Sequence, residues 1–398
     1  MVGSNAARYG GFRMKRLLRR LLLVVLAMAV AVVLLAALTP QGKTAVRAAL
    51  FIPQVLPAIP LKPQEWVTPD PTLKDIRFPT ATGEGVADLY VPGTAGRHSA
   101  VVFFQGVVPG GRYDSRIVAL GKGLARAGMV VMIPWSETQI EQRIAPDDVD
   151  NLVRAFQHLR TLDIVDPERV GMGGICVGAS MATVAAQDDR IRDQVRFVNF
   201  FAGYYDAADL ARAIATNSRF GEDYVVPWRP DKLTRRVFSY HLIDGVTDAA
   251  DKELLLRIFD QGDSQAEDET DSLSPDAMAV YRLLKGVAPE EVDAVMAQLS
   301  PRTTEFFQAI SPKTKIDRLK ARMLIMHDRA DRLVPSEESR RLAHALGEAG
   351  DTYFTEFSLF QKQIRVHMDE SGSIGPIDYA KEAFKLYLHM YNIMREVS

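Results

Sequence analysis

Cysteine is almost absent from this 398-residue chain, which contains only Cys176. A single cysteine excludes an intrachain disulfide framework and a cysteine-rich zinc site, and it leaves Cys176 as a thiol or thiolate. Net charge is almost absent as well, because 48 Lys and Arg residues against 50 Asp and Glu residues give a formal charge of −2 at pH 7. No basic excess is present to bind phosphate backbones, so we expect no nucleic-acid partner.

One long hydrophobic run, residues 21–38, lies near the N-terminus and carries no charge. A helix of this length spans about 27 Å, close to the ~30 Å hydrocarbon core of a bilayer. Basic residues between Arg13 and Arg20 precede the run, which favours a cytoplasmic N-terminus. We therefore expect residues 1–39 to be a single-pass transmembrane anchor, with the rest of the chain on the non-cytoplasmic side. The alternative is secretion after signal-peptide cleavage, but the run is long for a signal peptide and Ala36–Pro40 is a poor cleavage site.

The remaining chain divides by composition. Residues 40–75 contain seven prolines and are expected to form an extended linker. Buried-strand and helix patterns then alternate, which predicts an α/β fold with a mostly parallel sheet and helices on both faces. This core is expected in two parts, 76–203 and 310–398, separated by a helical cap insertion at 204–309. The expected strands are 76–91 (a hairpin), 100–104, 129–134, 169–173, 195–201, 322–327 and 353–359, and the expected helices are 115–126, 146–162, 177–186, 336–349 and 377–394.

Cys176 lies in the pentapeptide Gly174-Ile175-Cys176-Val177-Gly178, a G-x-C-x-G pattern. A nucleophile at the tip of a sharp strand-to-helix turn needs glycine two residues to either side, because a Cβ atom there would clash. A short apolar strand precedes the pattern, and a small, apolar helix follows it. The pattern predicts a nucleophile elbow. The alternative is a buried structural cysteine, since free cysteine is among the most buried residue types.

A cysteine nucleophile needs a base, and the base needs an orienting acid. Asp331 lies on the loop after the strand 322–327, with Asp328 as the nearer competitor. His367 follows the last expected strand and precedes the final helix, on a loop at the same sheet edge. The order nucleophile, acid, histidine is that of enzymes with a G-x-S-x-G elbow. The other histidines lie in expected helices, in the cap or at strand ends, and His327 is expected to be structural.

An oxyanion hole requires two backbone N–H groups directed at the developing charge. One is expected from Val177, directly after the nucleophile. The second is expected from Val107, in the glycine-rich loop after the strand 100–104, with Gly106 and Val108 as alternatives. That loop lacks the spacing of a phosphate-binding loop. The acidic stretch 263–271 lacks a spaced ligand pattern, so we expect a solvated linker there rather than a metal site.

These motifs together resemble the α/β-hydrolase superfamily, and within it the dienelactone-hydrolase-like branch. The resemblance covers about residues 76–202 and 310–398. Its matching pieces are Asp166-Pro167-Glu168-Arg169-Val170-Gly171 before the elbow, the segment His327 to Pro335, and His367. The His-Gly that the family commonly has after the first buried strand is Gln105-Gly106 here. Polyhydroxyalkanoate synthases, which transfer acyl groups through a thioester, are similar at the elbow.

The resemblance implies an α/β-hydrolase fold and a Cys176–His367–Asp331 triad, which requires neither a metal nor an organic cofactor. Such a triad cleaves a small-molecule ester, lactone or thioester through an acyl-enzyme. His367 would take the thiol proton, Asp331 would orient the imidazole, and the N–H groups of Val177 and Val107 would hold the oxyanion. Two other functions remain open: an acyltransferase of the polyhydroxyalkanoate-synthase type, and a non-catalytic binding protein with the same fold.

Overall fold

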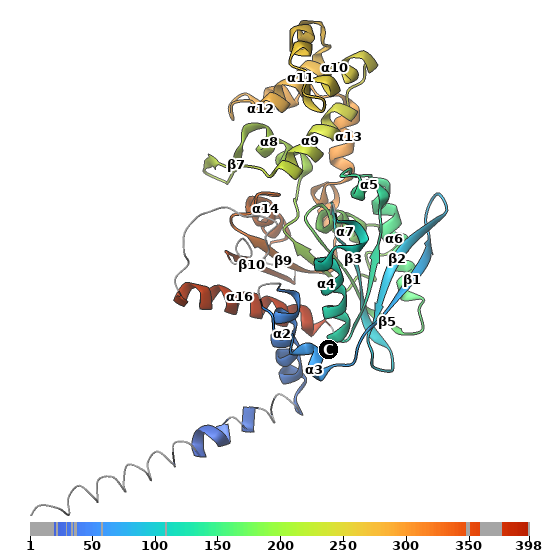
Figure 1. Cartoon of the computed structure of the whole chain (residues 1–398), viewed down its shortest axis with the longest axis vertical. Helices are drawn as coiled ribbons and strands as arrows, with labels where there is room; N and C mark the ends of the chain where they lie inside the picture. The colour runs from blue at the N-terminus through green and yellow to red at the C-terminus, as the bar shows by residue number, and fades with distance from the viewer. Residues whose placement is uncertain are drawn as a thin grey trace, which may run out of the picture.

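The structure is a computed structural model of the whole chain. It describes residues 20, 23–28, 30–32, 35, 38–56, 59–107, 110–347, 351–358 and 376–396. A core containing the sheet lies below a group of helices, and α2 and α16 lie side by side at the opposite end of the molecule (Figure 1).

The core is an eight-stranded sheet in the order β1-β2-β4-β3-β5-β6-β9-β10. Strand β2 is antiparallel to both β1 and β4, and the other neighbouring pairs are parallel. This arrangement is consistent with the α/β-hydrolase fold, and it confirms the expected mostly parallel sheet. The strands are β1 (Thr72–Pro79), β2 (Glu84–Val91), β3 (His98–Phe104), β4 (Met129–Pro134), β5 (Val165–Ile175), β6 (Phe197–Phe201), β9 (Arg322–Asp328) and β10 (Thr352–Phe357).

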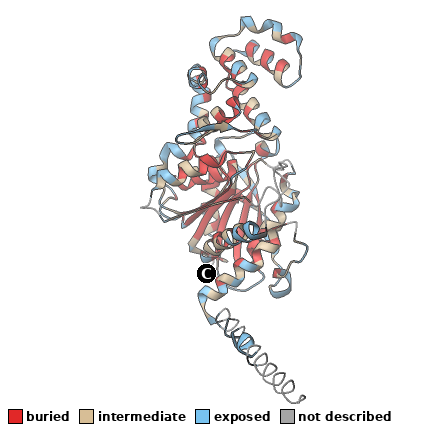
Figure 2. Cartoon of the chain, turned by 90° about the vertical axis from the view of Figure 1, so that its left-hand side faces the viewer, coloured by how far each residue is buried: buried red, intermediate tan, exposed pale blue. Residues whose placement is uncertain are grey.

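Helices cover both faces of the sheet, whose central strands are buried (Figure 2). Along β3, Val102 and Phe104 belong to the hydrophobic cluster on one face, and Val101 and Phe103 to the cluster on the other. Because both faces are buried, these strands are continuous apolar runs rather than alternating ones. On the first face lie α6 (Asp147–Arg160), α7 (Val177–Ala186) and α14 (Ser336–Leu346), and on the second α2 (Pro40–Val55), α4 (Ser115–Arg126) and α16 (Pro376–Arg395).

Strand β5 carries two glycines on the face that α2, α4 and α16 cover. A Cβ atom at Gly171 would come within 2.4 Å of the Phe197 ring, so that ring lies directly over the strand. Gly173 lies in one row with Phe103 on β3 and Asn199 on β6. The Phe197 ring thus takes the place of a side chain at Gly171, and Gly173 adds no side chain between Phe103 and Asn199.

The expected extended linker is wrong over residues 40–55, which form the helix α2. Thr39 caps this helix by accepting a hydrogen bond from the Gly42 N–H at 3.0 Å, and Pro40 occupies its first turn, where proline is tolerated. Phe51 is 3% exposed and packs into the cluster of α4 and α16. Proline composition alone suggested a tether, but the apolar side of this segment is buried against the core. The short helix α3 (Gln64–Val67) follows.

A mainly helical insertion lies between β6 and β9, neighbouring strands of the sheet. The core holds the start of the insertion through Glu338 of α14. This buried carboxylate accepts hydrogen bonds from the N–H groups of Tyr205 and Asp206, at 2.9 and 3.0 Å. The insertion contains α8 (Ala207–Thr216), β7 (Ser218–Phe220), β8 (Val225–Pro227), α9 (Lys232–Asp244), α10 (Ala249–Phe259), α11 (Pro275–Lys285), α12 (Val292–Met296) and α13 (Pro301–Ala309).

The expected anchor at residues 21–38 falls only partly on described residues. Among the residues that the structure describes, no helix has both the length and the hydropathy needed to cross a bilayer.

Candidate active site

Cys176 lies on the sharp turn between β5 and α7. Its φ of 55° and ψ of −133° are unusual for a residue other than glycine. Its N–H donates to the Phe201 carbonyl at 2.9 Å, and its carbonyl accepts from the Ala179 N–H at 3.0 Å. The surrounding sheet and helix therefore hold the strained turn in place, as a nucleophile elbow requires.

Steric crowding explains the two glycines of the elbow, Gly174 and Gly178. A Cβ atom at Gly178 would lie 2.1 Å from the Phe104 carbonyl oxygen, and one at Gly174 would lie 2.4 Å from the Gly178 carbonyl carbon. The helix and the end of β3 approach each other this closely only because both side chains are missing. Gly106, at a φ of 77°, continues this contact into the loop after β3.

The Cys176 thiol is protonated at neutral pH. The residue is half-buried, and burial in apolar surroundings, with the Asp331 carboxylate nearby, raises the pKa of the thiol to about 12. The backbone N–H of Val177 acts in the opposite direction. A nucleophile in this state requires a base to take its proton as it attacks.

Both expected oxyanion donors are among the described residues. Val177 is the first residue of α7, where backbone N–H groups have no partner within the helix. Val107 follows Gly106 and borders the same two cavities as Cys176. Val177 thus begins α7 and Val107 lies in the loop after β3, and the close contact of Gly178 with Gly106 brings these two segments together. Val108, an alternative donor, lies outside the described residues.

Asp331 lies on the loop after β9 and borders a cavity that Cys176 also borders. Its Oδ1 accepts hydrogen bonds from the N–H groups of Leu333 and Val334, at 2.6 and 3.2 Å. Its carbonyl oxygen accepts from the indole N–H of Trp228 in the cap, at 2.8 Å. The carboxylate is therefore fixed in the loop, close enough to Cys176 to raise the pKa of its thiol. Asp328 borders the same cavity, and its Oδ1 accepts from the Ala330 N–H at 3.0 Å.

His367, the expected base, lies outside the described residues. His327 is fully buried, as expected of a structural histidine, with Nδ1 2.7 Å from the Ser339 hydroxyl and Nε2 3.0 Å from the Val334 carbonyl oxygen. In the cap, His241 Nε2 accepts a hydrogen bond from the Ile144 N–H at 2.8 Å, and burial lowers its pKa to about 4. Both rings are thus held in structural hydrogen bonds.

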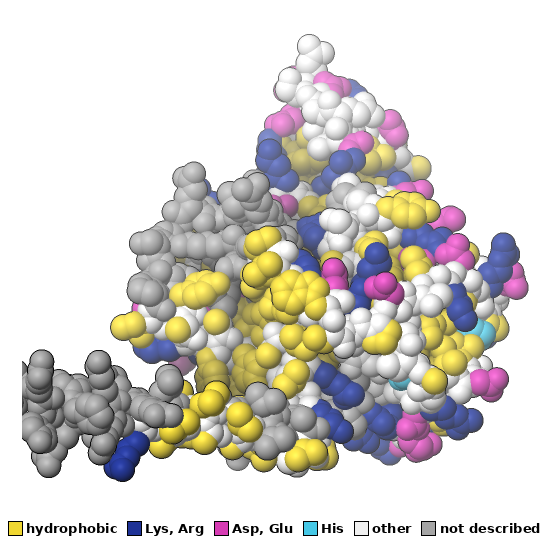
Figure 3. All heavy atoms as spheres, turned by 60° about the horizontal axis from the view of Figure 1, so that its bottom comes forward, with side chains coloured by type: hydrophobic (Ala, Val, Ile, Leu, Met, Phe, Trp, Pro, Cys, Tyr) yellow, Lys and Arg dark blue, Asp and Glu magenta, His cyan; other side chains and the backbone are white. Residues whose placement is uncertain are grey.

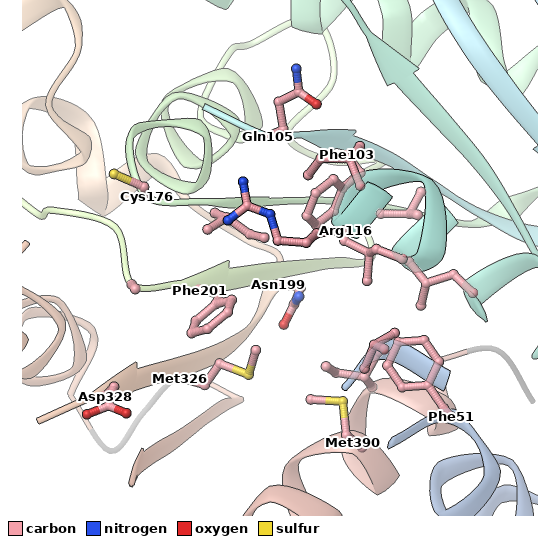
Figure 4. A pocket seen from close by; sticks show the side chains of 18 of the residues that line it. Phe51, Phe103, Gln105, Arg116, Cys176, Asn199, Phe201, Met326, Asp328 and Met390 are labelled. Carbon is pink, nitrogen blue, oxygen red and sulfur yellow. The ribbon is translucent and has the colours of Figure 1, made fainter. Parts of the chain in front are cut away.

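Two cavities meet at Cys176. The sheet cavity, about 240 Å³, lies on the face of the sheet that α2, α4 and α16 cover. The cap cavity, about 90 Å³, lies between the nucleophile and helices α8, α9 and α13. In the sheet cavity, Cys176 lies at one side and Phe51 and Met390 at the other (Figure 4). A substrate held at the thiol would have one space on each side of its reacting carbonyl.

Two polar residues that the motif analysis did not single out border these cavities. Tyr204 is 2% exposed and borders the cap cavity, and its hydroxyl has no hydrogen-bond partner among the described residues. Asn199 borders the sheet cavity, and its Oδ1 is likewise buried without a described partner. A signal was present in the sequence: Asn199 is the lone amide in an apolar strand, and Tyr204 closely follows that strand.

The structure has similarities of fold with solved hydrolases. The uncomplexed acylaminoacyl peptidase of Pyrococcus horikoshii has a TM-score of 0.49 and 14% identity over 83% of this chain and 43% of its own. The 2,6-dihydroxy-pseudo-oxynicotine hydrolase has a TM-score of 0.47 and 13% identity over 82% and 68%. The esterase of Pyrobaculum calidifontis has a TM-score of 0.45 and 13% identity over 90% and 93%. The chain thus spans less than half the length of the peptidase. No family model and no curated protein sequence matches it.

Proposed function

We propose that this protein is a hydrolase that cleaves an ester, lactone or thioester with Cys176 as its nucleophile. The observation that carries the proposal is the backbone of Cys176, held at a φ of 55° between the end of a parallel strand and a helix N-terminus. Cys176 borders two cavities, and Val107 borders both of them while Val177 borders the cap cavity. This combination supports a nucleophile and an oxyanion hole acting on one carbonyl group.

The protonated thiol sets the order of events. Sγ attacks the substrate carbonyl while a base takes its proton, and the N–H groups of Val177 and Val107 stabilise the oxyanion. The C–O or C–S bond then breaks, the leaving group receives that proton, and an acyl thioester of Cys176 remains. Water attacks the thioester, again giving up a proton to the base, and the thiol takes that proton as it leaves.

We assign the base to His367 and its orientation to Asp331. Support for Asp331 comes from its fixed carboxylate beside the thiol, and support for His367 comes from its position in the chain after the acid. His327 is a poor candidate, because Ser339 and the Val334 carbonyl already occupy its ring nitrogens.

Acyl transfer is the second candidate. The cap cavity, which Cys176 shares, is lined mainly by apolar residues such as Ala211, Phe238 and Phe307. Such a space would suit an acceptor alcohol or thiol better than water. Product analysis with and without an added acceptor separates transfer from hydrolysis.

We also propose that residues 21–38 anchor the protein in a membrane, with the catalytic domain on the non-cytoplasmic side. Besides the basic and apolar pattern, large hydrophobic side chains are exposed near α2: Leu61, Trp66 and Val67 are 63%, 70% and 65% exposed. Hydrophobic side chains gather on this end of the molecule (Figure 3). Carbonate extraction and protease protection of membrane vesicles test the anchor and its orientation.

A panel of chromogenic esters tests the proposed activity on wild type, Cys176→Ala and Cys176→Ser. We expect Cys176→Ala to abolish turnover, and wild type quenched during turnover to show a covalent acyl adduct by intact mass. Equal rates for wild type and Cys176→Ala would remove Cys176 as the nucleophile and favour a non-catalytic role for the fold.

A further inference from the structure

We infer that the acyl group of the substrate is a long hydrocarbon chain that lies in the sheet cavity, directed from Cys176 toward α2 and α16. The inference rests on the proposed function and names its substrate class. The cap cavity would then hold the leaving group of the ester, or the acceptor in an acyl transfer.

The depth of the sheet cavity supports a long chain. Its lining includes Phe201 and Phe197, at the two ends of β6. Four residues of parallel strand span roughly 13 Å at ~3.3 Å each. An extended alkyl chain advances ~1.3 Å per carbon for C–C bonds of ~1.5 Å, so this depth fits roughly ten carbons.

The volume and lining agree with that occupant. A dry cavity of ~150 Å³ already admits benzene, and the sheet cavity measures about 240 Å³. Away from the thiol its walls are mainly hydrocarbon, from Leu120 and Leu124 on α4 and from Leu386, Met390 and Ile393 on α16. A short or charged acyl group would leave this surface without a partner, whereas an alkyl chain would cover it.

The surroundings of the sheet cavity also indicate that it binds an acyl chain. Gly173 adds no side chain between Phe103 and Asn199, which both border the cavity at the centre of the sheet, where packing would normally be dense. The space continues up to the nucleophile rather than being closed off from it. The opposite wall is α2, whose Phe51, Ile52 and Val55 border the cavity. The expected membrane segment directly precedes α2, so the cavity lies near the proposed source of long acyl chains.

The test measures kcat/KM for p-nitrophenyl esters from two to sixteen carbons. For wild type we expect a gain of roughly four-fold per methylene up to about ten carbons, from ~0.8 kcal/mol for each buried methylene. Leu120→Trp fills the cavity and should move the optimum to six carbons or fewer, with acetate hydrolysis changed less than three-fold. Met390→Ala lengthens the cavity and should move the optimum upward. The matched control is Leu210→Trp, which fills the cap cavity and should leave the length profile unchanged.

A binding measurement keeps this inference separate from the proposed activity. We expect 1-decanol, but not 1-butanol, to raise the melting temperature of wild type, and Leu120→Trp to lose that shift. One outcome is that the protein binds decanol, loses that binding in Leu120→Trp and yet cleaves no ester. This result would overturn the hydrolase assignment and keep the alkyl-chain site in the sheet cavity. Ester cleavage with kcat/KM independent of chain length would overturn only the alkyl-chain site. The same conclusion would follow if Leu210→Trp, and not Leu120→Trp, moved the optimum to shorter chains.

Discussion

His327 Nε2 lies 3.6 Å from Asp331 Oδ2, but it lies closer, at 3.0 Å, to the carbonyl oxygen of Val334. Its other nitrogen lies 2.7 Å from the Ser339 hydroxyl, and burial lowers the pKa of the ring. The proximity of a histidine to the candidate acid therefore does not form a catalytic pair. His327 instead contacts the Val334 carbonyl oxygen of the loop that carries Asp331.

Asp331→Asn tests the orienting role of that carboxylate. An amide keeps an oxygen for the Leu333 and Val334 N–H groups but removes the charge that stabilises an imidazolium. We expect kcat to fall on the order of 10³–10⁴-fold with little change in melting temperature. Asp328→Asn, at the end of β9 and bordering the same cavity, is the matched control and should lower kcat by less than about ten-fold. Equal losses in both variants would argue against Asp331 as the acid.

The alkylation rate of Cys176 tests its protonation state, since this is the only cysteine. With a pKa of about 12, roughly one thiol in 10⁴ is ionised at pH 8, against about a quarter of free thiols with a pKa near 8.5. The greater nucleophilicity of a more basic thiolate offsets this in part. We expect folded protein to react with iodoacetamide on the order of fifty-fold more slowly than unfolded protein at pH 8. A rate equal to or above that of free thiol would show a preformed thiolate.

The same shift makes stability depend on pH. Above pH ~9 the unfolded chain loses the thiol proton while the folded chain retains it, so folded protein binds more protons. The free energy of unfolding should then fall by about 1.4 kcal/mol per pH unit until the folded thiol titrates. Urea unfolding at pH 8 and pH 10 measures this slope. Cys176→Ala lacks the group, and the difference between the two proteins isolates it from other titrations.

Tyr204→Phe tests the buried hydroxyl that borders the cap cavity. Burial first, and then the neighbouring Cys176, raise the pKa of this phenol well above 10, so it can only donate or accept as a neutral group. If it hydrogen-bonds the substrate, kcat/KM should fall about ten-fold. The melting temperature should stay constant or rise, because no described partner is lost. Tyr205→Phe changes the adjacent tyrosine, which does not border that cavity, and should leave kcat/KM unchanged.

Asn199→Leu should stabilise the protein. The buried Oδ1 of Asn199 has no described partner, and replacing such an amide by a hydrocarbon of similar size should gain about 1–3 kcal/mol. Asn392→Leu is the matched control, because Asn392 accepts from Arg322 and donates to the Leu388 carbonyl, both at 3.0 Å. It should destabilise. Urea unfolding of both variants measures the contrast, and a loss of stability in Asn199→Leu would contradict it.

Trp66 reports on membrane contact, being 70% exposed, whereas Trp228 is buried. Vesicles of phosphatidylcholine and phosphatidylglycerol should shift the tryptophan emission of wild type to shorter wavelength, since indole rings prefer the bilayer interface. Trp66→Ser should lose most of that shift while ester turnover in solution is unchanged. An equal shift in Trp66→Ser would place the contact elsewhere on the molecule.

Much of the core could be predicted from local pattern. The helices 115–126 and 177–186 and the strand 129–134 have the expected bounds, because buried strands and tight helices leave clear apolar signals. The elbow followed from glycine spacing, whose steric cause is the approach of Gly178 to Phe104. The helix α2 was missed because its stability comes from packing against α4 and α16, which no local pattern reveals. Asn199 and Tyr204 were missed for a related reason: only the assembled fold brings them to the cavities.

The helix α2 has a practical consequence for anyone preparing this protein without the hydrophobic residues 21–38. A truncation beginning at residue 60 would delete α2 with Phe51, Ile52 and Val55 and open one wall of the sheet cavity to solvent. Such a product could still cleave acetate esters and be misread as a short-chain esterase. A truncation beginning at Thr39 would keep the helix, its N-terminal cap and that wall of the cavity.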